Sequence, residues 1–330
     1  MALPFGSEEL EAAISPRLEI VEERLRDAVA QSDRLAHATS RHLVDAGGKR
    51  LRPMLTLLTA QLGDGTRSEV VDAAVVVELT HLATLYHDDV MDSAPTRRGA
   101  PAAHEVWGNS VAILTGDLLF ARASRVVAGL GPEAVRIQAE TFERLCLGQL
   151  HETVGPAESD DPVAHYIQVL ADKTGSLIAT SALFGARFAG CEQRTVDAVT
   201  QYGELAGVAF QLADDVIDVR SDAETTGKTP GTDLREGVPT MPVLLLRERV
   251  AAGGSDEDRA LLAAIDGDLS GDDALAAVVS QLRDHPVVDE TSRLAQQWAG
   301  RAKDALAPLP EGDVRDALLT FADALVARAS

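Results

Sequence analysis

The sequence predicts an all-α fold, and both composition and periodicity support this class. Ala, Leu and Val dominate, whereas aromatic residues make up only 4% of the 330 positions. Ala and Leu are strong helix formers, and strands are usually richer in aromatic side chains. Apolar residues recur at helical spacing along nearly the whole chain, and we find no convincing alternating strand or hairpin turn.

Turn signals divide the chain into the expected helices. The breaks fall where Gly clusters or meets Pro, as at Gly63-Asp64-Gly65 and Gly131-Pro132. Because the last helices alone would make a thin core, we interpret the polar segment 253–258 as a loop within one domain over residues 1–330. Periodicity between the breaks predicts helices over residues 8–44, 50–62, 67–93, 102–129, 133–153, 162–170, 174–189, 192–220, 239–252, 257–266, 272–282, 288–307 and 312–329.

The charge balance excludes some partners. The formal net charge is -22, with 52 acidic against 30 basic residues. Such a chain repels nucleic acid and anionic lipid headgroups, so neither is an expected partner. It also repels a diphosphate, unless basic clusters and metal ions reverse the field locally.

We expect no membrane span and a cytoplasmic location. Residues 1–20 carry several glutamates, with no basic leader and no long apolar stretch, which excludes a signal peptide. No window reaches the roughly 18 uncharged apolar residues that a membrane-spanning helix needs.

Two acidic clusters of the same pattern end two long apolar helical runs. They are Asp88, Asp89 and Asp92 in the first run and Asp214, Asp215 and Asp218 in the second. Residues four apart share a helix face, and like charges there destabilise the helix, most of all at its C-terminal end. Carboxylate oxygens are the hard ligands that Mg²⁺ prefers, so the pattern predicts bound Mg²⁺.

One acidic cluster alone is more often a solvated helix end. Two such clusters argue against that interpretation, and the two helix faces also correspond in position. His81 and Gly207 each precede the first Asp of their cluster by seven residues. The pair of motifs therefore predicts a shared chemical role.

Basic residues that suit a diphosphate stand near both clusters. Gly47-Gly48-Lys49 leads into a helix, whose N-terminal amides favour anions, and Arg52 can point the same way as Lys49. The spacing is not that of a P-loop. The other candidates are Arg97 and Arg98 after the first cluster, Lys173 with Thr174 at a helix start, and Lys228 after the second cluster. Each is more often a surface charge by itself.

With these motifs the chain resembles the trans-polyprenyl diphosphate synthases, a family that shares the all-α isoprenoid synthase fold with class I terpene cyclases. The resemblance covers about residues 40–245. It implies a single large bundle around a central cavity, with residues 255–330 forming its C-terminal helices. It also implies a homodimer that condenses isopentenyl diphosphate with an allylic diphosphate of geranyl or farnesyl type.

The resemblance also implies residue roles. Asp88, Asp92 and Asp214 would lead in binding Mg²⁺, and Asp89, Asp215 and Asp218 would assist. Lys49, Arg52, His81 and Arg98 would hold isopentenyl diphosphate. Arg97, Lys173, Thr174, Gln211 and Lys228 would hold the allylic diphosphate, with Lys173 also counted among the catalytic groups.

Small side chains before the first cluster predict a long product. Each helical turn rises ~5.4 Å, about one isoprene unit, so residues in the turns before Asp88 would bear on chain length. These are Thr84, Ala83, Thr80 and Val77. No Phe or Tyr stands among them, unlike in short-chain members. Long products of this family commonly serve as quinone side chains.

Two alternatives stay open. A class I terpene cyclase would use the same metals, but its usual second motif is missing here. A non-catalytic subunit of a heteromeric synthase usually loses the aspartates, whereas this chain keeps all six. A plain helical scaffold would leave the paired acidic faces unexplained.

Overall fold

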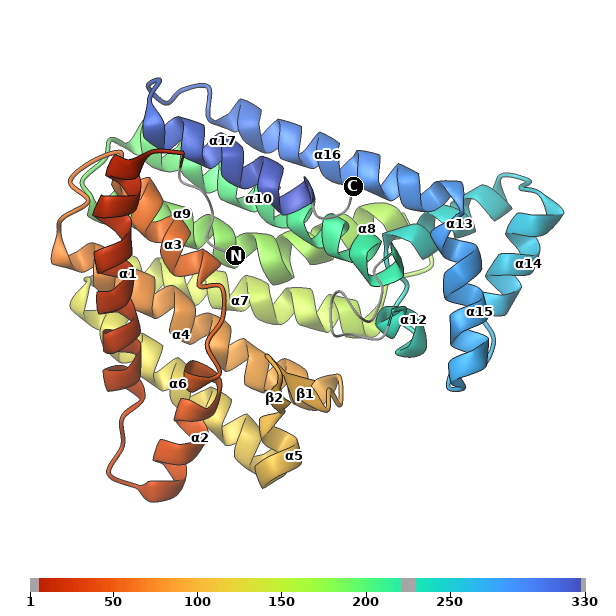
Figure 1. Ribbon diagram of the computed structural model, residues 1–330, viewed down its shortest axis with the longest axis horizontal. Helices are drawn as coiled ribbons and strands as arrows, with labels where there is room; N and C mark the ends of the chain where they lie inside the picture. Colours follow the sequence, from red (N-terminus) through yellow and green to blue (C-terminus); the bar gives the residue numbers. More distant parts are fainter. Residues whose placement is uncertain (1–5, 221–229, 328–330) are drawn as a thin grey trace. The chain divides into compact units, whose positions relative to one another are not determined.

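The computed structural model describes residues 6–220 and 230–327, which are almost entirely helical (Figure 1). Its elements in chain order are α1 (Glu8–Val29), α2 (Arg34–Asp45), α3 (Leu51–Ala60), α4 (Ser68–Met91), β1 (Thr96–Arg97), β2 (Ala100–Pro101), α5 (Ala103–Trp107), α6 (Asn109–Gly129), α7 (Pro132–Val154), α8 (Pro162–Leu170), the π-helical turn η1 (Ala171–Gly175), α9 (Ser176–Phe188), α10 (Gln193–Arg220), α12 (Thr232–Arg235), α13 (Met241–Ala251), α14 (Asp256–Ile265), α15 (Asp272–Arg283), α16 (Pro286–Ala305) and α17 (Asp313–Val326). The predicted all-α class is confirmed.

Two expected helices are each divided in the structure. The stretch 8–44 breaks after Val29, because the Asp33 side chain accepts a hydrogen bond from the Ala36 amide and caps a new helix, α2. The stretch 102–129 breaks at Gly108, whose φ of 83° lies outside the helical region. Each break depends on the conformation or capping of a single residue, which hydrophobic periodicity does not reveal.

A two-residue hairpin, β1 with β2, corrects the expectation of no hairpin. Thr96 pairs with Pro101 and Arg97 with Ala100, which leaves Arg98 and Gly99 as the turn. Both turn residues have positive φ, 55° and 78°, as a type I′ turn requires. Strands of two residues are too short to show an alternating pattern, so hydrophobic alternation cannot reveal them.

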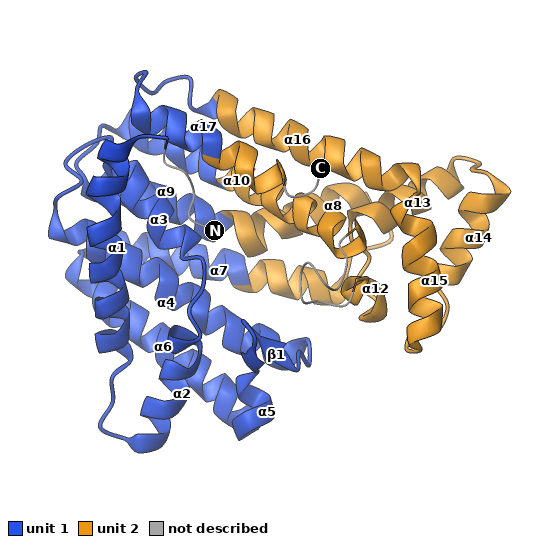
Figure 2. Ribbon diagram, viewed as in Figure 1, with its two compact units in different colours: residues 1–145, 176–203, 305–320 blue, residues 146–175, 204–304, 321–330 orange. Residues whose placement is uncertain are grey.

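The chain divides into two compact units (Figure 2). Unit 1 comprises residues 1–145, 176–203 and 305–320, and unit 2 comprises residues 146–175, 204–304 and 321–330. The expectation of one domain over residues 1–330 stays a prediction. Within the described ranges, no helix is both long enough and apolar enough to cross a lipid bilayer.

In unit 1, α4 packs against α3, α6 and α9. Helix α3 lies against α9 at a crossing that side-chain hydroxyls and one glycine make possible. Thr56 Oγ1 donates to the Ser181 carbonyl at 2.9 Å, and Thr59 Oγ1 donates to the Ala182 carbonyl at 3.0 Å. A Cβ placed on Gly185 would stand 2.1 Å from the Thr56 carbonyl oxygen, so only glycine fits there. This close crossing fixes the positions of α3 and α9, which both pack against α4.

Unit 2 has a core of its own. Buried apolar residues of α8, α10, α13, α15 and α16 form one cluster, among them Leu212, Leu246 and Val288. The cluster covers the buried face of α10 next to the second acidic motif. It therefore fixes the position of α10 within this unit.

We expect Gly185→Ala to lower the free energy of unfolding by about 1–3 kcal/mol, because the added methyl overpacks the α3–α9 crossing. Gly300→Ala is the matched control, since Gly300 also lies within a helix but a Cβ placed on it would have no atom within 4 Å. That variant should be stabilised by roughly 0.5–1 kcal/mol through helix propensity. Urea unfolding of both variants makes the comparison, and equal effects would contradict the close crossing.

Candidate active site

The first acidic motif lies where the sequence predicts it, at the C-terminal end of α4. Asp88 is partly exposed, Asp89 is buried, and Asp92 is the exposed C-cap residue, whose amide donates to the Asp88 carbonyl. The helix forms because an apolar run fills the middle of unit 1, and it ends as the chain turns toward the hairpin. Carboxylates at this end meet the unfavourable pole of the helix dipole.

Arg97 holds the middle carboxylate of this motif. Its Nε lies 2.6 Å and its Nη2 2.5 Å from Asp89 Oδ1. Asp89 Oδ2 is buried and has no hydrogen-bond partner among the residues that the structure describes. The sequence predicted Arg97 as a diphosphate ligand. The structure adds that it neutralises Asp89, reaching back to the helix end from the first strand of the hairpin.

A cluster of basic side chains surrounds His81, two turns before Asp88 on α4. Burial holds the pKa of His81 well below its usual 6.5, and the charges of Arg52, Arg98 and Arg97 lower it further. The imidazole is therefore neutral at pH 7. It can donate a hydrogen bond without adding charge.

Arg52 is a partly buried cation of this cluster. Burial lowers the pKa of its guanidinium to about 10; Glu78 and Asp88 oppose that shift, and Arg98 adds to it. Arg52 Nε is buried with no hydrogen-bond partner in the described part of the chain. Unit 1 thus brings Arg52, His81, Arg98 and Asp88 close enough to influence one another electrostatically. The exposed Lys49 belongs to the turn before α3. Such a group of donors suits an anion.

Three of the four residues predicted to set chain length are buried in unit 1. Val77, Thr80 and Ala83 are buried, and Thr84 is partly exposed. Val77 belongs to a core cluster with Leu177, Phe184 and other apolar residues of α6, α7 and α9. Gly116 of α6 approaches the Ala83 carbonyl so closely that an added Cβ would lie 3.1 Å from it.

The second acidic motif lies at the C-terminal end of α10, in unit 2. Asp214 is partly exposed, whereas Asp215 is buried and accepts hydrogen bonds from Tyr166 Oη at 3.0 Å and the Met241 amide at 3.2 Å. Burial raises the pKa of Asp215 well above its usual value, and Asp233 raises it further. Asp218 accepts from the amides of Thr232 and Asp233 at the start of α12. Both carboxylates therefore fasten α10 to its neighbours.

Lys173 lies in the π-helical turn η1, between α8 and α9. A wider turn inside helical structure frequently marks a functional site. Its Nζ pairs with Glu152 of α7, and α7 comes so close that a Cβ on Gly148 would stand 2.6 Å from the Lys173 amide. Thr174 is buried and Gln211 is partly buried, whereas Lys228 lies outside the described residues.

The sequence did not single out three partners of the predicted residues. Glu78 is fully buried on α4, Glu152 pairs with Lys173, and Tyr166 donates to Asp215. Glu78 had a signal, because it is the one charge within the apolar run from Ala73 to Leu85. Glu152 and Tyr166 sit among ordinary helix residues, and only the tertiary structure reveals their roles. Among the described residues, no three His, Cys, Asp or Glu side chains form a ready metal-binding group.

Comparison with known proteins gives consistent results along nearly the whole chain. The sequence model of the polyprenyl synthetase family matches residues 33–282. A nonaprenyl diphosphate synthase of Mycobacterium tuberculosis is 43% identical over 326 residues, covering 98% of this chain and 96% of that protein. A dimethylallyltranstransferase of the same organism is 36% identical and covers 98% of this chain and 97% of that protein.

Solved structures agree. A polyprenyl synthase from Caulobacter crescentus, complexed with calcium and isoprenyl diphosphate, has a TM-score of 0.87 at 33% identity, covering 97% of each chain. A decaprenyl diphosphate synthase from Rhodobacter capsulatus has a TM-score of 0.86 at 31% identity, covering 98% of this chain and 99% of that one.

The buried Asp215 gives a pH dependence that can be tested. A raised carboxyl pKa in the folded state means that the unfolded chain loses its proton first as the pH rises above the usual 3.8. Stability therefore falls with rising pH in this window, by up to about 1.4 kcal/mol per pH unit. Asp215→Asn removes this loss, so its stability relative to the wild type should improve as the pH rises.

Urea unfolding of the two proteins between pH 4 and 8, in the presence of a chelator, measures the difference. The prediction would be contradicted if the wild type became more stable relative to Asp215→Asn as the pH rises. That result would show that the buried Asp215 carboxylate is ionised and that its charge is stabilised by its neighbours.

Proposed function

Because this chain belongs to the polyprenyl synthetase family, we propose that it is a trans-prenyltransferase that condenses isopentenyl diphosphate with an allylic diphosphate to give a linear, long-chain polyprenyl diphosphate. It has the all-α isoprenoid synthase fold of its relatives. The observation that carries the proposal is the group formed in unit 1 by the first acidic motif, the neutral His81 and the arginines around it. Long-chain products are named for several relatives.

The basic residues are proposed to bind the two substrates. Arg52 supports this assignment best, because its Nε is buried and unpartnered among the described residues and Arg98 adds a neighbouring positive charge. A diphosphate relieves that repulsion and supplies acceptors. We assign isopentenyl diphosphate to Lys49, Arg52, His81 and Arg98, and the allylic diphosphate to Arg97, Lys173, Thr174, Gln211 and Lys228.

The acidic residues are proposed to bind Mg²⁺, with Asp88, Asp92 and Asp214 as the leading ligands. Carboxylate oxygens fit this hard cation, and the buried Oδ2 of Asp89, which has no partner among the described residues, fits a nearby cation as well. The proposed part of Asp89, Asp215 and Asp218 is to assist from fixed positions. When bound, Mg²⁺ stabilises the negative charge that develops on the leaving diphosphate.

The proposed reaction joins the two diphosphates that these residues would bind. As the allylic C–O bond breaks, arginine and lysine side chains keep the diphosphate in place. The double bond of isopentenyl diphosphate then attacks the allylic cation, and a proton is lost. We propose that the departing diphosphate takes this proton, because His81 lies among positive charges that disfavour protonation. We also propose that apolar side chains around the site exclude water, which would trap the cation as an alcohol.

The wider setting is also a proposal. We propose a homodimer. The proposal is supported by exposed apolar side chains on two consecutive helices of unit 1, α5 and α6: Val106, Ile113 and Leu114. Exposed apolar groups in one area often mark a contact between chains. A cytoplasmic location and a product that serves as a quinone side chain remain proposals from the family resemblance.

The purified chain, incubated alone with Mg²⁺, labelled isopentenyl diphosphate and geranyl or farnesyl diphosphate, should form a labelled linear product. Asp88→Asn should lower kcat by roughly 100-fold or more, because charge stabilisation in the transition state is lost. Asp72→Asn is the control on the same helix, since Asp72 forms an exposed pair with Arg24. A chelator should abolish turnover and added Mg²⁺ should restore it.

Chromatography of the dephosphorylated products reads out activity and product length together. A cyclic hydrocarbon would favour the terpene cyclase, and activity that requires a second protein would favour the non-catalytic subunit. Equal activity of the two Asp variants would remove the metal assignment.

We expect Ala83→Phe to shorten the product, because a bulky side chain would then block the path one turn before Asp88. Ala74→Phe adds the same volume at another fully buried position, nine residues earlier and on the opposite face of α4. Both variants should lose roughly 1–3 kcal/mol of stability by overpacking. Only Ala83→Phe should change chain length, measured by reversed-phase chromatography, and an unchanged product would defeat the assignment.

A further inference from the structure

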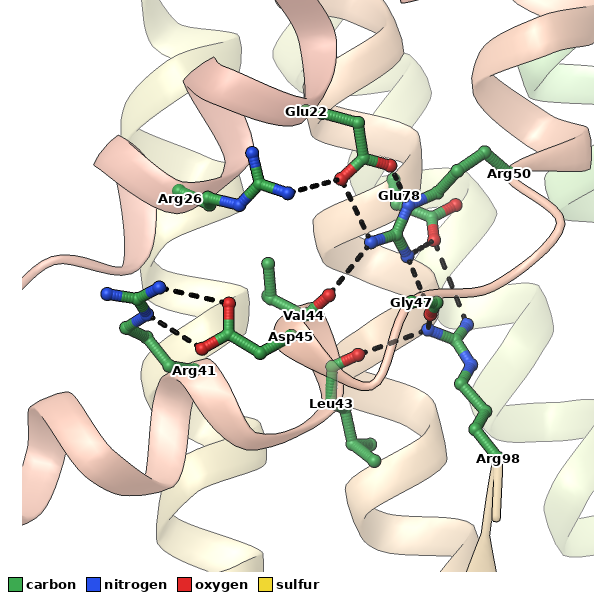
Figure 3. Close-up of polar contacts among 10 residues, drawn as sticks. All are labelled: Glu22, Arg26, Arg41, Leu43, Val44, Asp45, Gly47, Arg50, Glu78 and Arg98. Carbon is green, nitrogen blue, oxygen red and sulfur yellow. Dashed lines mark hydrogen bonds and ion pairs between the residues drawn. The ribbon is translucent and has the colours of Figure 1, made fainter. Parts of the chain in front are cut away.

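A buried ion network lies beneath the turn between α2 and α3 in unit 1 (Figure 3). Its centre is Arg50, the N-cap residue of α3, whose side chain is 3% exposed. All five N–H groups of its guanidinium donate to protein acceptors. Those acceptors are both carboxylate oxygens of Glu22, Oε1 of Glu78 at 2.8 Å, and the carbonyls of Val44 and Gly47 at 3.1 and 3.3 Å. Lysine has three donors on one atom and cannot reproduce this fork.

Arg98 joins the same network from the β1–β2 turn. Its Nη1 donates to the carbonyls of Leu43 and Gly47, and its Nη2 lies 3.8 Å from Glu78 Oε1. Figure 3 shows both guanidinium groups turned toward Gly47 and Glu78. Two arginines far apart in the sequence thus share one carbonyl and one buried carboxylate. Glu78 is the counter-ion for both.

The backbone of the network is strained at several points that meet. Arg50 and Arg98 have φ of 48° and 55°, which lie in the left-handed region. This backbone conformation is energetically unfavourable for residues other than glycine. Gly48 has φ of 143°, and a Cβ there would stand 2.8 Å from Arg98 Cζ. Such strain persists where the surroundings over-determine the conformation, and here the surroundings are the Arg50–Glu78 pair and its carbonyl partners.

We propose that Arg50 and Glu78 are positioning residues of the isopentenyl diphosphate site: their buried ion pair fixes the Gly47-Gly48-Lys49 turn and Arg98. The inference rests on the function proposed above, which assigns Lys49, Arg52 and Arg98 to that diphosphate. Arg50 and Glu78 direct their polar atoms to the protein and act through these neighbours. Lys49 and Arg52 flank Arg50 in the chain, and Arg98 is held by the same acceptors.

A positioning role and a purely electrostatic role of Arg50 and Glu78 predict different effects of substitution on diphosphate binding. Glu78→Gln removes a negative charge beside two arginines, so a purely electrostatic role predicts tighter binding of a diphosphate. A positioning role predicts weaker binding, because the turn and Arg98 lose their shared anchor. Arg50→Lys keeps the charge and loses the fork, so the electrostatic role predicts no change and the positioning role again predicts weaker binding.

The experiment measures steady-state kinetics of the purified full chain with Mg²⁺, varying each substrate in turn. For Glu78→Gln and Arg50→Lys we expect the KM for isopentenyl diphosphate to rise by roughly 10- to 100-fold, the range that small misplacements of binding groups produce. The KM for the allylic diphosphate should stay within about twofold, because its proposed ligands lie outside the network. Asp72→Asn is the matched control, since Arg24 and Asp72 join the same two helices, α1 and α4, as Glu22 and Glu78 do, but in an exposed pair.

A second readout needs no substrate. Hydrogen exchange of the amides of residues 46–52 should speed up in Glu78→Gln and Arg50→Lys and stay unchanged in Asp72→Asn. Where a buried substitution prevents folding, Gly48→Ala replaces it, because this exposed position displaces Arg98 without opening the core. It should raise the same KM selectively.

The possible failures are distinguishable. A wild-type chain that makes no product from either primer overturns the proposed function itself. An active wild type whose variants keep or lower the KM for isopentenyl diphosphate overturns the positioning role alone. Equal changes in both KM values, with slower turnover and a lower melting temperature, would show a general loss of structure and also overturn it.

Discussion

Compensation of buried positive charge is the constraint on which unit 1 depends. Arg50 is almost fully buried, and an unpaired guanidinium in such a position would strongly destabilise the folded state. The chain meets this cost for Arg50 with Glu22, Glu78 and two carbonyl oxygens, so that its donors are all used. Arg52, two residues further along the chain, keeps a buried Nε without a partner among the described residues. The protein thus satisfies the donors of one arginine completely, whereas its neighbour retains a donor that fits the proposed diphosphate.

The acidic motifs show the same division between fixed and functional charges. Protein donors hold Asp89, Asp215 and Asp218 through Arg97, Tyr166 and the first amides of α12. The first aspartate of each motif is only partly buried. Each helix end therefore carries carboxylates that fasten the backbone beside carboxylates proposed as metal ligands. This arrangement explains why the motif needs adjacent aspartates: neighbours in sequence point to different sides of a helix, one toward the core and one away from it.

Periodicity and motif spacing predicted the helices and the places of both acidic motifs, because these depend on patterns that repeat over many residues. The divisions at Ala30 and Gly108 escaped prediction, since a single cap or a single positive φ decides them. The partners Glu22 and Tyr166 escaped for a different reason. Nothing local distinguishes a helical Glu that will meet Arg50 from one that will face water, so only packing between distant segments assigns its role.

The whole chain is strongly acidic, whereas the group around His81 is rich in arginine, and distance decides which of these charges acts on a substrate. At physiological salt, charges separated by more than ~8 Å of water are largely screened, so the net charge of -22 acts weakly on a ligand already near the site. Within that range the arginines around His81 dominate. The acidic surface still attracts divalent cations, and a diphosphate that arrives with Mg²⁺ carries less negative charge than the free anion. A strongly acidic protein can therefore use an anionic substrate, provided that its buried arginines are held at fixed positions before the substrate arrives.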